Sequence, residues 1–127
     1  MKPQKIVYKK QLLIHNNIIK GLKNKFLKDI KEVYLVGSLA NGNFGRYIRK
    51  YKGYYGSDID LVVIPNKIPK NWNYEGVFYN WHKRYNGGTI KIKDIEHPIN
   101  FMIPFKLNIN IFWKKVRDFQ WKVEKIK

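Results

Sequence analysis

The sequence predicts an α/β (α+β) fold in which a small mixed sheet is flanked by helices. Three observations favour it: an amphipathic helical pattern near the start, several short apolar runs typical of buried strands, and a second helical pattern at the end. The 127 residues fit one domain, and no internal repeat or low-complexity linker divides them. We therefore expect residues 1–127 to form a single domain.

The first helix is predicted over about residues 9–30. Apolar residues recur there every four positions, and lysines occupy much of the remaining surface. This spacing gives a helix one apolar stripe, which is buried against the rest of the domain. The stripe consists of Ile14, Ile18, Leu22, Phe26 and Ile30.

Two short apolar runs, residues 33–36 and 59–64, are predicted strands bounded by glycine, serine or proline. Residues 41–57 lie between them, are rich in Gly, Tyr, Lys and Arg, and show no regular period. We expect an irregular loop there and a second loop over residues 66–73.

The second half of the chain is predicted to contain one helix, two strands and a terminal helix. Residues 74–85 are expected to be helical, and Asn86-Gly87-Gly88 is a strong turn signal. Residues 89–94 alternate apolar and lysine side chains, which is typical of a half-buried strand, and residues 99–103 form another apolar run. Apolar residues at helical spacing over residues 105–127 predict a basic amphipathic helix.

The formal net charge of +17 is the main indication about partners, and it results from 26 Lys plus Arg against 9 Asp plus Glu. Such a surplus favours polyanions, nucleic acid first, although lysines can also serve solubility alone. The absence of cysteine excludes disulfides and thiolate metal sites. No apolar run approaches the ~20 residues that span a bilayer, so we expect a cytoplasmic protein without a membrane segment.

Asp58 and Asp60 are the residues most indicative of chemistry. On a strand, residues two positions apart point to the same face, so both carboxylates would lie side by side. Neighbouring carboxylates repel each other, and a divalent cation such as Mg²⁺ relieves this repulsion. The alternative is a structural turn, in which Ser57 and Asp58 cap backbone groups and Asp60 pairs with a lysine.

Gly37 and Ser38 follow the preceding apolar run. Glycine lets the backbone approach a phosphate closely, and the following N–H groups and hydroxyl can hold its oxygens. A phosphate cradle followed by a carboxylate pair at the next strand is more specific than either feature alone.

Residues 33–45, VYLVGSLANGNFG, and residues 57–65, SDIDLVVIP, together resemble the nucleotidyltransferase superfamily of the DNA polymerase beta type, which includes kanamycin nucleotidyltransferase and the minimal nucleotidyltransferases. The resemblance covers about residues 33–103 and implies the α/β core of that family. It implies that Gly37 and Ser38 grip an NTP. It also implies that Asp58 and Asp60 bind Mg²⁺ or Mn²⁺, which activates the attacking hydroxyl and neutralises the leaving pyrophosphate.

The sequence departs from the family pattern in the length of one segment. The stretch between the two motifs is longer than usual, and the excess falls in residues 46–55, which we expect to be an inserted loop beside the site. Its tyrosines and cations could stack bases and contact phosphates, or they could simply pack on the domain.

The second departure concerns the third carboxylate of the family. The matching position is Asn100, in HPINFMIP, and an amide brings neither negative charge nor a proton-accepting group. Slow or absent catalysis would follow. With a different register, Asp94, on the strand face of Ile90 and Ile92, or Glu96 would take this place.

These features predict transfer of a nucleoside monophosphate from an NTP to a hydroxyl acceptor, on nucleic acid or on a partner protein. The alternative is a catalytically degenerate nucleotide- or RNA-binding module of the same fold. His15, His82 and His97 lack metal-ligand spacing, so we expect them to be structural or exposed.

Overall fold

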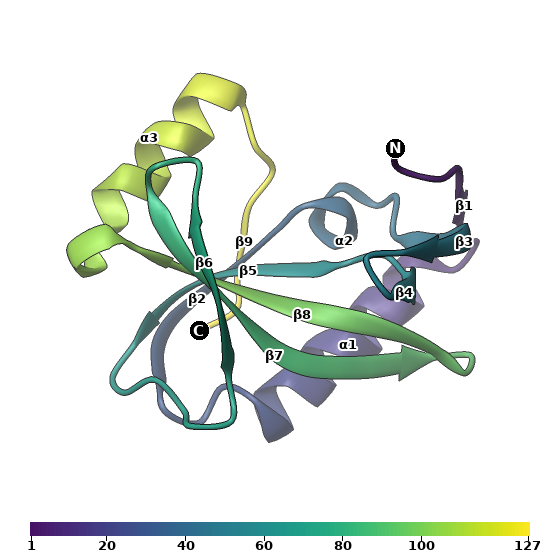
Figure 1. Ribbon diagram of the computed structural model, residues 1–127, viewed down its shortest axis with the longest axis horizontal. Helices are drawn as coiled ribbons and strands as arrows, with labels where there is room; N and C mark the ends of the chain where they lie inside the picture. Colours follow the sequence, from purple (N-terminus) through teal and green to yellow (C-terminus); the bar gives the residue numbers. More distant parts are fainter.

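The computed structural model describes residues 1–127 as two sheets and three α-helices (Figure 1), which confirms the predicted small α+β fold. The elements in chain order are β1 (Lys5–Val7), α1 (Gln11–Lys25), β2 (Ile30–Val36), α2 (Ser38–Asn41), β3 (Gly45–Tyr51), β4 (Tyr54–Gly56), β5 (Ile59–Pro65), β6 (Asn73–Phe78), β7 (His82–Ile92), β8 (Ile95–Pro104), a 3₁₀ turn (Phe105–Leu107), α3 (Ile109–Phe119) and β9 (Glu124–Lys125).

The larger sheet has six strands in the order β6-β7-β8-β5-β2-β9, and the smaller has three in the order β1-β3-β4. In the larger sheet only β5 and β8 run parallel, so the sheet is mixed, as predicted. The smaller sheet contacts the larger one where β4 packs on β8. Strand β4 ends at Gly56, just before β5 begins at Ile59.

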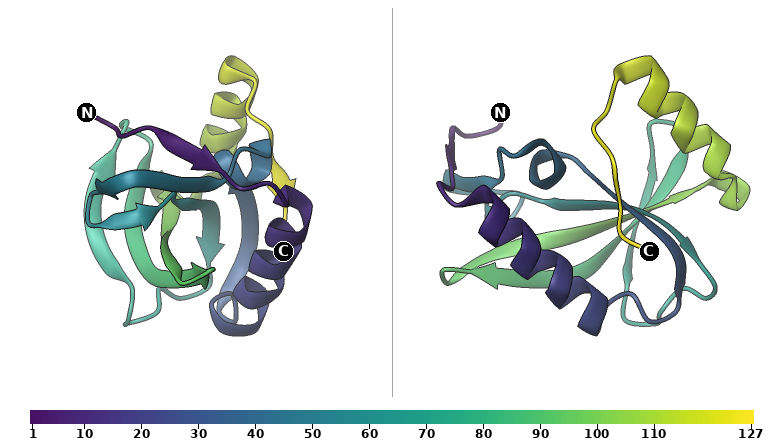
Figure 2. Two further views of the ribbon diagram at one scale, coloured as in Figure 1. Left: turned by 90° about the vertical axis from the view of Figure 1, so that its right-hand side faces the viewer. Right: turned by 180° about the vertical axis from the view of Figure 1, so that it is seen from behind.

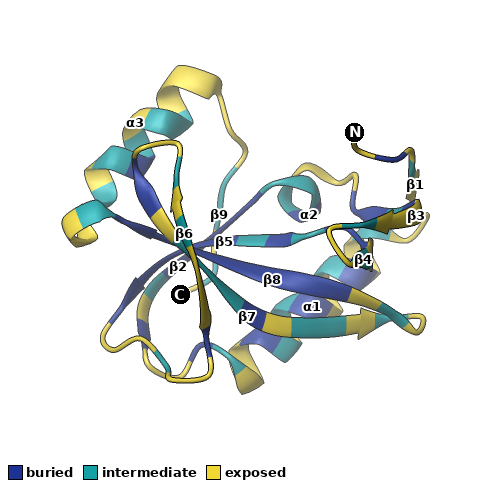
Figure 3. Cartoon of the chain, in the orientation of Figure 1, coloured by how far each residue is buried: buried dark blue, intermediate teal, exposed yellow.

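Helices cover the two faces of the six-stranded sheet unequally. Helix α1 lies across one face, as Figure 2 shows from behind, and 17 buried hydrophobic residues form the core on that side. Helix α3 covers only part of the other face, where the corresponding cluster has 6 buried residues. Strand β8 is buried along most of its length, whereas the hairpin tips are exposed (Figure 3).

Helix α1 confirms the predicted amphipathic pattern but ends at Lys25, before the predicted boundary at residue 30. Ile14, Ile18 and Leu22 are its buried stripe. Lys23 and Lys25 lie in the last turn, where cations interact favourably with the helix dipole.

The predicted helix over residues 74–85 is wrong, because these residues form β6 and the start of β7. Tyr79 and Asn80 have φ values of 53° and 59°, in the left-handed region, and a right-handed helix cannot contain them. Gly76 also has a positive φ of 122°.

The predicted turn at Asn86-Gly87-Gly88 is wrong as well, since these residues lie within β7 at an irregularity of its pairing with β8. A Cβ on Gly87 would collide with the Phe101 ring, so the glycine there serves close packing. The chain reverses instead at Lys93 and Asp94, both with positive φ.

Two further predictions need correction. Residues 46–55 are mostly the β3–β4 hairpin, which pairs with β1, and not an irregular inserted loop. The terminal helix spans only Ile109–Phe119, because Gln120 adopts a left-handed conformation and ends it. The chain then returns along β2 as β9.

None of the helices combines the length and apolar character required to cross a membrane.

Candidate active site

Three predicted site residues meet on the α3 side of the six-stranded sheet. The parallel pairing of β5 with β8 sets Asp60 directly opposite Asn100. The Asn100 amide Nδ2 donates to Asp58 Oδ2 at 3.0 Å and to Asp60 Oδ1 at 3.2 Å. The amide presents its nitrogen because carboxylates only accept hydrogen bonds. The predicted common face of Asp58, Asp60 and Asn100 is therefore confirmed, and we call these three residues the amide-bridged cluster.

Burial and mutual repulsion disfavour the charged forms of both carboxylates. Burial raises the pKa of Asp60 to about 6, and the neighbouring Asp58 charge contributes to the rise. Burial also raises the pKa of Asp58, while the Asn100 hydrogen bond and the Arg84 charge oppose it. Neither carboxylate forms an ion pair, since the structure contains a single salt bridge, elsewhere. Two acids thus lie together without a cation in contact.

The alternative of a structural turn at Ser57, Asp58 and Asp60 is only partly correct. Ser57 Oγ donates to the Gly45 carbonyl at 2.8 Å and accepts from the Gly45 N–H at 3.2 Å, so this serine does hold backbone groups. The side chain of Asp58 caps no backbone group, and no lysine pairs with Asp60. Ser57 therefore provides the backbone anchoring, and the side chains of the two carboxylates bond only to Asn100.

Gly37 connects the Gly-Ser motif to the carboxylates. Its φ of 80° favours glycine, and a Cβ at this position would lie 2.6 Å from Asp60 Oδ2. Any side chain here would displace Asp60, so the glycine keeps the carboxylate in place. Gly37 borders the cleft described next, whereas Ser38 begins α2, is half-buried and does not border it.

Two members of the amide-bridged cluster, Asp58 and Asp60, line a cleft of about 750 Å³. Lys2, the β3–β4 turn, the β6–β7 turn and the α3 end also line it, together with Val36, Gly37, Asn41 and Met102. Its cationic residues are Lys2, Lys52, Arg84, Lys115 and Lys122, and its aromatic residues are Tyr51, Tyr79, Trp81, Phe119 and Trp121. Sequence reasoning missed the residues of the β6–β7 turn because it assigned them to a helix, and no motif marks them.

The alternative third ligands do not join the cluster. Asp94 lies exposed in the β7–β8 turn and not on the strand face of Ile90 and Ile92, so that prediction was wrong. Glu96 is exposed on β8, opposite Lys91. No group of three or more His, Cys, Asp or Glu side chains that could hold a metal ion occurs in the structure. Asn100, and neither Asp94 nor Glu96, is the residue that contacts both Asp58 and Asp60.

His97 holds the residue that precedes Asp58. Its Nδ1 is 2.8 Å from the Ser57 carbonyl oxygen, which only accepts, so Nδ1 carries the proton. Its Nε2 then accepts from the Tyr8 hydroxyl at 2.9 Å. Burial lowers the pKa of His97, consistent with a neutral ring. This histidine is structural, as predicted.

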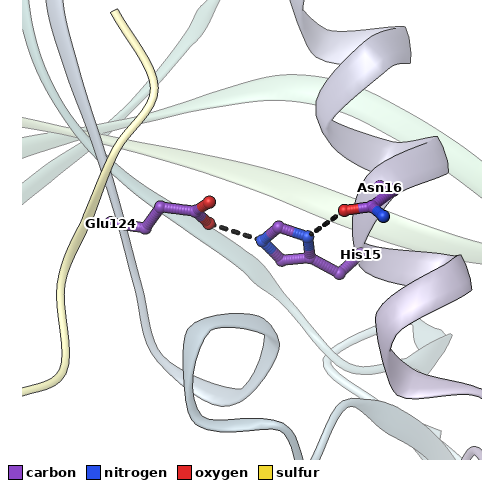
Figure 4. Close-up of polar contacts among 3 residues, drawn as sticks. All are labelled: His15, Asn16 and Glu124. Atoms are coloured by element: carbon purple, nitrogen blue, oxygen red, sulfur yellow. Dashed lines mark hydrogen bonds and ion pairs between the residues drawn. The ribbon is translucent and has the colours of Figure 1, made fainter.

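The other two histidines differ from each other. His15, on α1, bonds to Glu124 of β9 at 2.5 Å and to Asn16 at 2.9 Å (Figure 4). His82 is buried in the wall of the cleft, and neither of its ring nitrogens has a hydrogen-bond partner.

No protein-family model, curated protein or solved structure matches this chain. The chemistry of the site is therefore inferred from its own residues.

Proposed function

We propose that this protein is a metal-dependent nucleotidyltransferase that moves a nucleoside monophosphate from an NTP to a hydroxyl acceptor, on nucleic acid or on a partner protein. The observation that carries the proposal is the amide-bridged cluster: two carboxylates joined by one amide, without a cationic partner, next to Gly37 in an open cleft. The resemblance of residues 33–45 and 57–65 to the nucleotidyltransferase superfamily of the DNA polymerase beta type supports the same class. A cytoplasmic location is part of the proposal.

The donor set fits Mg²⁺ or Mn²⁺. Mg²⁺ commonly takes one or two carboxylates and completes its shell with water and substrate phosphates. The raised pKa of Asp60 indicates an uncompensated negative charge, which a bound cation would stabilise. Asp58 and Asp60 are the residues that would hold it. When bound, the metal would neutralise phosphate charge and lower the pKa of the attacking hydroxyl.

The residues of the chain supply positioning and charge around this centre. Gly37 presents backbone at the cleft without a side chain, and we assign it to the triphosphate. Ser38 does not border the cleft, so its expected contact with the triphosphate is not part of this proposal. The positive charge of Arg84, on β7, acts to lower the pKa of both carboxylates. Arg84 would therefore attract phosphate oxygens toward them. Asn100 orients the carboxylates through its two hydrogen bonds.

Asn100 also favours a second candidate function, a catalytically degenerate nucleotide- or RNA-binding module. An amide cannot take the proton of an attacking hydroxyl, so chemistry would be slow although binding persists. The two candidates differ in whether any nucleotide is transferred.

Label transfer from each α-labelled NTP, with Mg²⁺ or Mn²⁺ and with RNA, DNA or protein acceptors, tests the proposal. We expect transfer that Asp58→Asn or Asp60→Asn abolishes while the far-UV circular dichroism spectrum stays unchanged. Metal-dependent NTP binding without transfer would favour the binding module. Metal affinity that is unchanged in both variants would refute both candidates.

Asn100→Asp is the sharpest test of the difference between the candidates. The substitution adds a third carboxylate opposite Asp60, and a catalytic base contributes ~10²–10⁴-fold. We expect transfer and metal affinity to rise, with lower stability in EDTA because three acids then repel. Asn100→Ser is the matched control, since it removes the amide without adding charge.

A further inference from the structure

Three exposed aromatic side chains line the open end of the cleft. Tyr79, in the β6–β7 turn, is 77% exposed, and Phe119 and Trp121, at the end of α3, are 61% and 37% exposed. The rings of Phe119 and Trp121 lie 6.0 Å apart and within 21° of parallel. We call these three residues the aromatic rim. Large aromatic rings are usually buried, so three exposed rings on one cleft are typical of an interaction site.

Tyr79 also has an unusual backbone conformation. Tyr79 has a φ of 53°, in the left-handed region that favours glycine or asparagine. Its ring stays in water, so packing does not compensate for this conformation. A strained residue whose side chain projects over a cleft is typical of a functional site.

Cations accompany the aromatic rings. Lys115 and Lys122 belong to the same part of the lining, and Lys115 Nζ lies 5.8 Å from the centre of the Phe119 ring. The whole cleft carries five cationic side chains and only two carboxylates. The partner should therefore offer both flat apolar faces and negative charge.

His82 adds a hydrogen-bonding requirement beside the aromatic rim. The side chain is 1% exposed, and both ring nitrogens lack partners. Arg84, the next residue on the same face of β7, has an unpartnered Nε. A neutral imidazole needs one acceptor and one donor, and the edge of a nucleobase offers both. A phosphate monoanion or an acyl chain does not combine these features with a stacking face.

We propose that the aromatic rim binds single-stranded nucleic acid, with unpaired bases stacked on Tyr79, Phe119 and Trp121 and backbone phosphates against Lys115 and Lys122. Bases of a duplex are stacked on each other and cannot lie on these rings, so single strands are preferred. The strand would lead toward Asp58 and Asp60, and its identity as the hydroxyl acceptor rests on the proposed function.

Fluorescence anisotropy with a labelled 15-nucleotide single strand, RNA or DNA, and with the same sequence as a duplex tests this proposal. We expect the single strand to bind more tightly than the duplex. Tyr79→Ala and Phe119→Ala should each weaken single-strand binding about 5- to 150-fold, as loss of one stacked base does. Both side chains are exposed, so both variants should fold, which thermal melting checks. Tyr74→Ala is the control, because Tyr74 is an exposed ring (56%) of the same hairpin as Tyr79 and lies outside the cleft.

Salt dependence separates stacking from charge. Lys115→Gln and Lys122→Gln should each flatten the slope of log affinity against log salt by ~0.7, whereas Tyr79→Ala should leave the slope unchanged. Lys114→Gln, an exposed neighbour on α3 outside the cleft, is the control. A slope that falls only when Arg46, Arg49 and Lys50, which lie outside the cleft lining, are neutralised would move the contact to the β3–β4 hairpin and overturn the proposal.

Equal binding of single strand and duplex, unchanged affinity in both rim variants, or an equal loss in Tyr74→Ala would also overturn it. The assay runs in EDTA without NTP, so it reports strand binding whether or not the protein transfers a nucleotide. Binding at the rim by a protein that transfers nothing would refute the proposed function alone.

Discussion

The two faces of the six-stranded sheet are built from the same strands but have different roles. On β8, Ile99, Phe101 and Ile103 point into the core under α1, while Asn100 and Met102 point to the α3 side. The first face is apolar and closed. The second begins as a small apolar cluster and then opens into a polar cleft at Asp58 and Asp60. A strand with one closed face can carry unfavourable charges on the other, because the closed face supplies the stability.

The largest effect should come from opening the closed face. Phe101 stacks on Trp72 with ring centres 3.7 Å apart and a 7° angle between the planes. Phe101→Ala should therefore lower the free energy of unfolding by about 3–5 kcal/mol, measured by urea denaturation. Phe119→Ala removes the same ring from an exposed position and should change stability by less than about 0.5 kcal/mol. Similar losses in both variants would contradict the division between the faces.

The next effect should have the opposite sign and lie on the cleft face. The folded pKa of Asp60, about 6, is above its ordinary value of 3.8, so ionisation of Asp60 opposes folding as pH rises through this range. Asp60→Asn should stabilise the metal-free protein on the order of 1–2 kcal/mol at pH 7, allowing for partial exposure. The gain should disappear below about pH 4. Urea denaturation in EDTA at several pH values measures it, and an Asp60→Asn variant less stable at pH 7 would refute it.

His97 should give the reverse pH dependence from the closed face. Burial lowers its folded pKa below the ordinary value of 6.5, so its contribution is complete above pH 6.5 and is lost as pH falls. We expect the stability difference between wild type and His97→Gln to shrink as the pH falls from 7.5 to 4.5. Burial lowers the pKa of His82 as well, so the pH dependence of the wild type alone contains both histidines. The measurement is therefore the difference in stability between the wild type and His97→Gln at each pH. A constant difference would mean that His97 is not held neutral.

The smallest effect should be at the surface, where His15 meets Glu124. This pair is only partly exposed, and pairs near the surface contribute about 0–1 kcal/mol. His15→Ala should therefore lower stability by no more than this, with slightly faster amide hydrogen exchange in residues 124–127. A loss above 2 kcal/mol would show that the tail is part of the cooperative core.

The alternation of side chains made the cleft face predictable. Asp58, Asp60 and Asn100 could be assigned to one face from strand period alone, because every second residue of their strands is Ile, Leu or Phe. Gly37 could be linked to the site by motif, although its contact with Asp60 required the structure.

Other parts of the molecule could not be predicted, for physical reasons. The β6–β7 hairpin turns at Tyr79 and Asn80, and a tyrosine with positive φ carries no sequence signal. The cleft wall combines residues from both ends of the chain, such as Lys2 and Trp121, which only tertiary packing brings together. The role of His97 likewise depends on its contact with Tyr8, 89 positions away.

The short strand β9 has a consequence for the behaviour of the protein in solution. It pairs with Tyr34 and Leu35 and so covers the outer edge of β2, whose sequence IKEVYLV is rich in β-branched and aromatic residues. An uncovered edge of this composition is a template for intermolecular strand pairing. Release of only a few residues of the tail would therefore expose this edge and favour strand pairing between molecules.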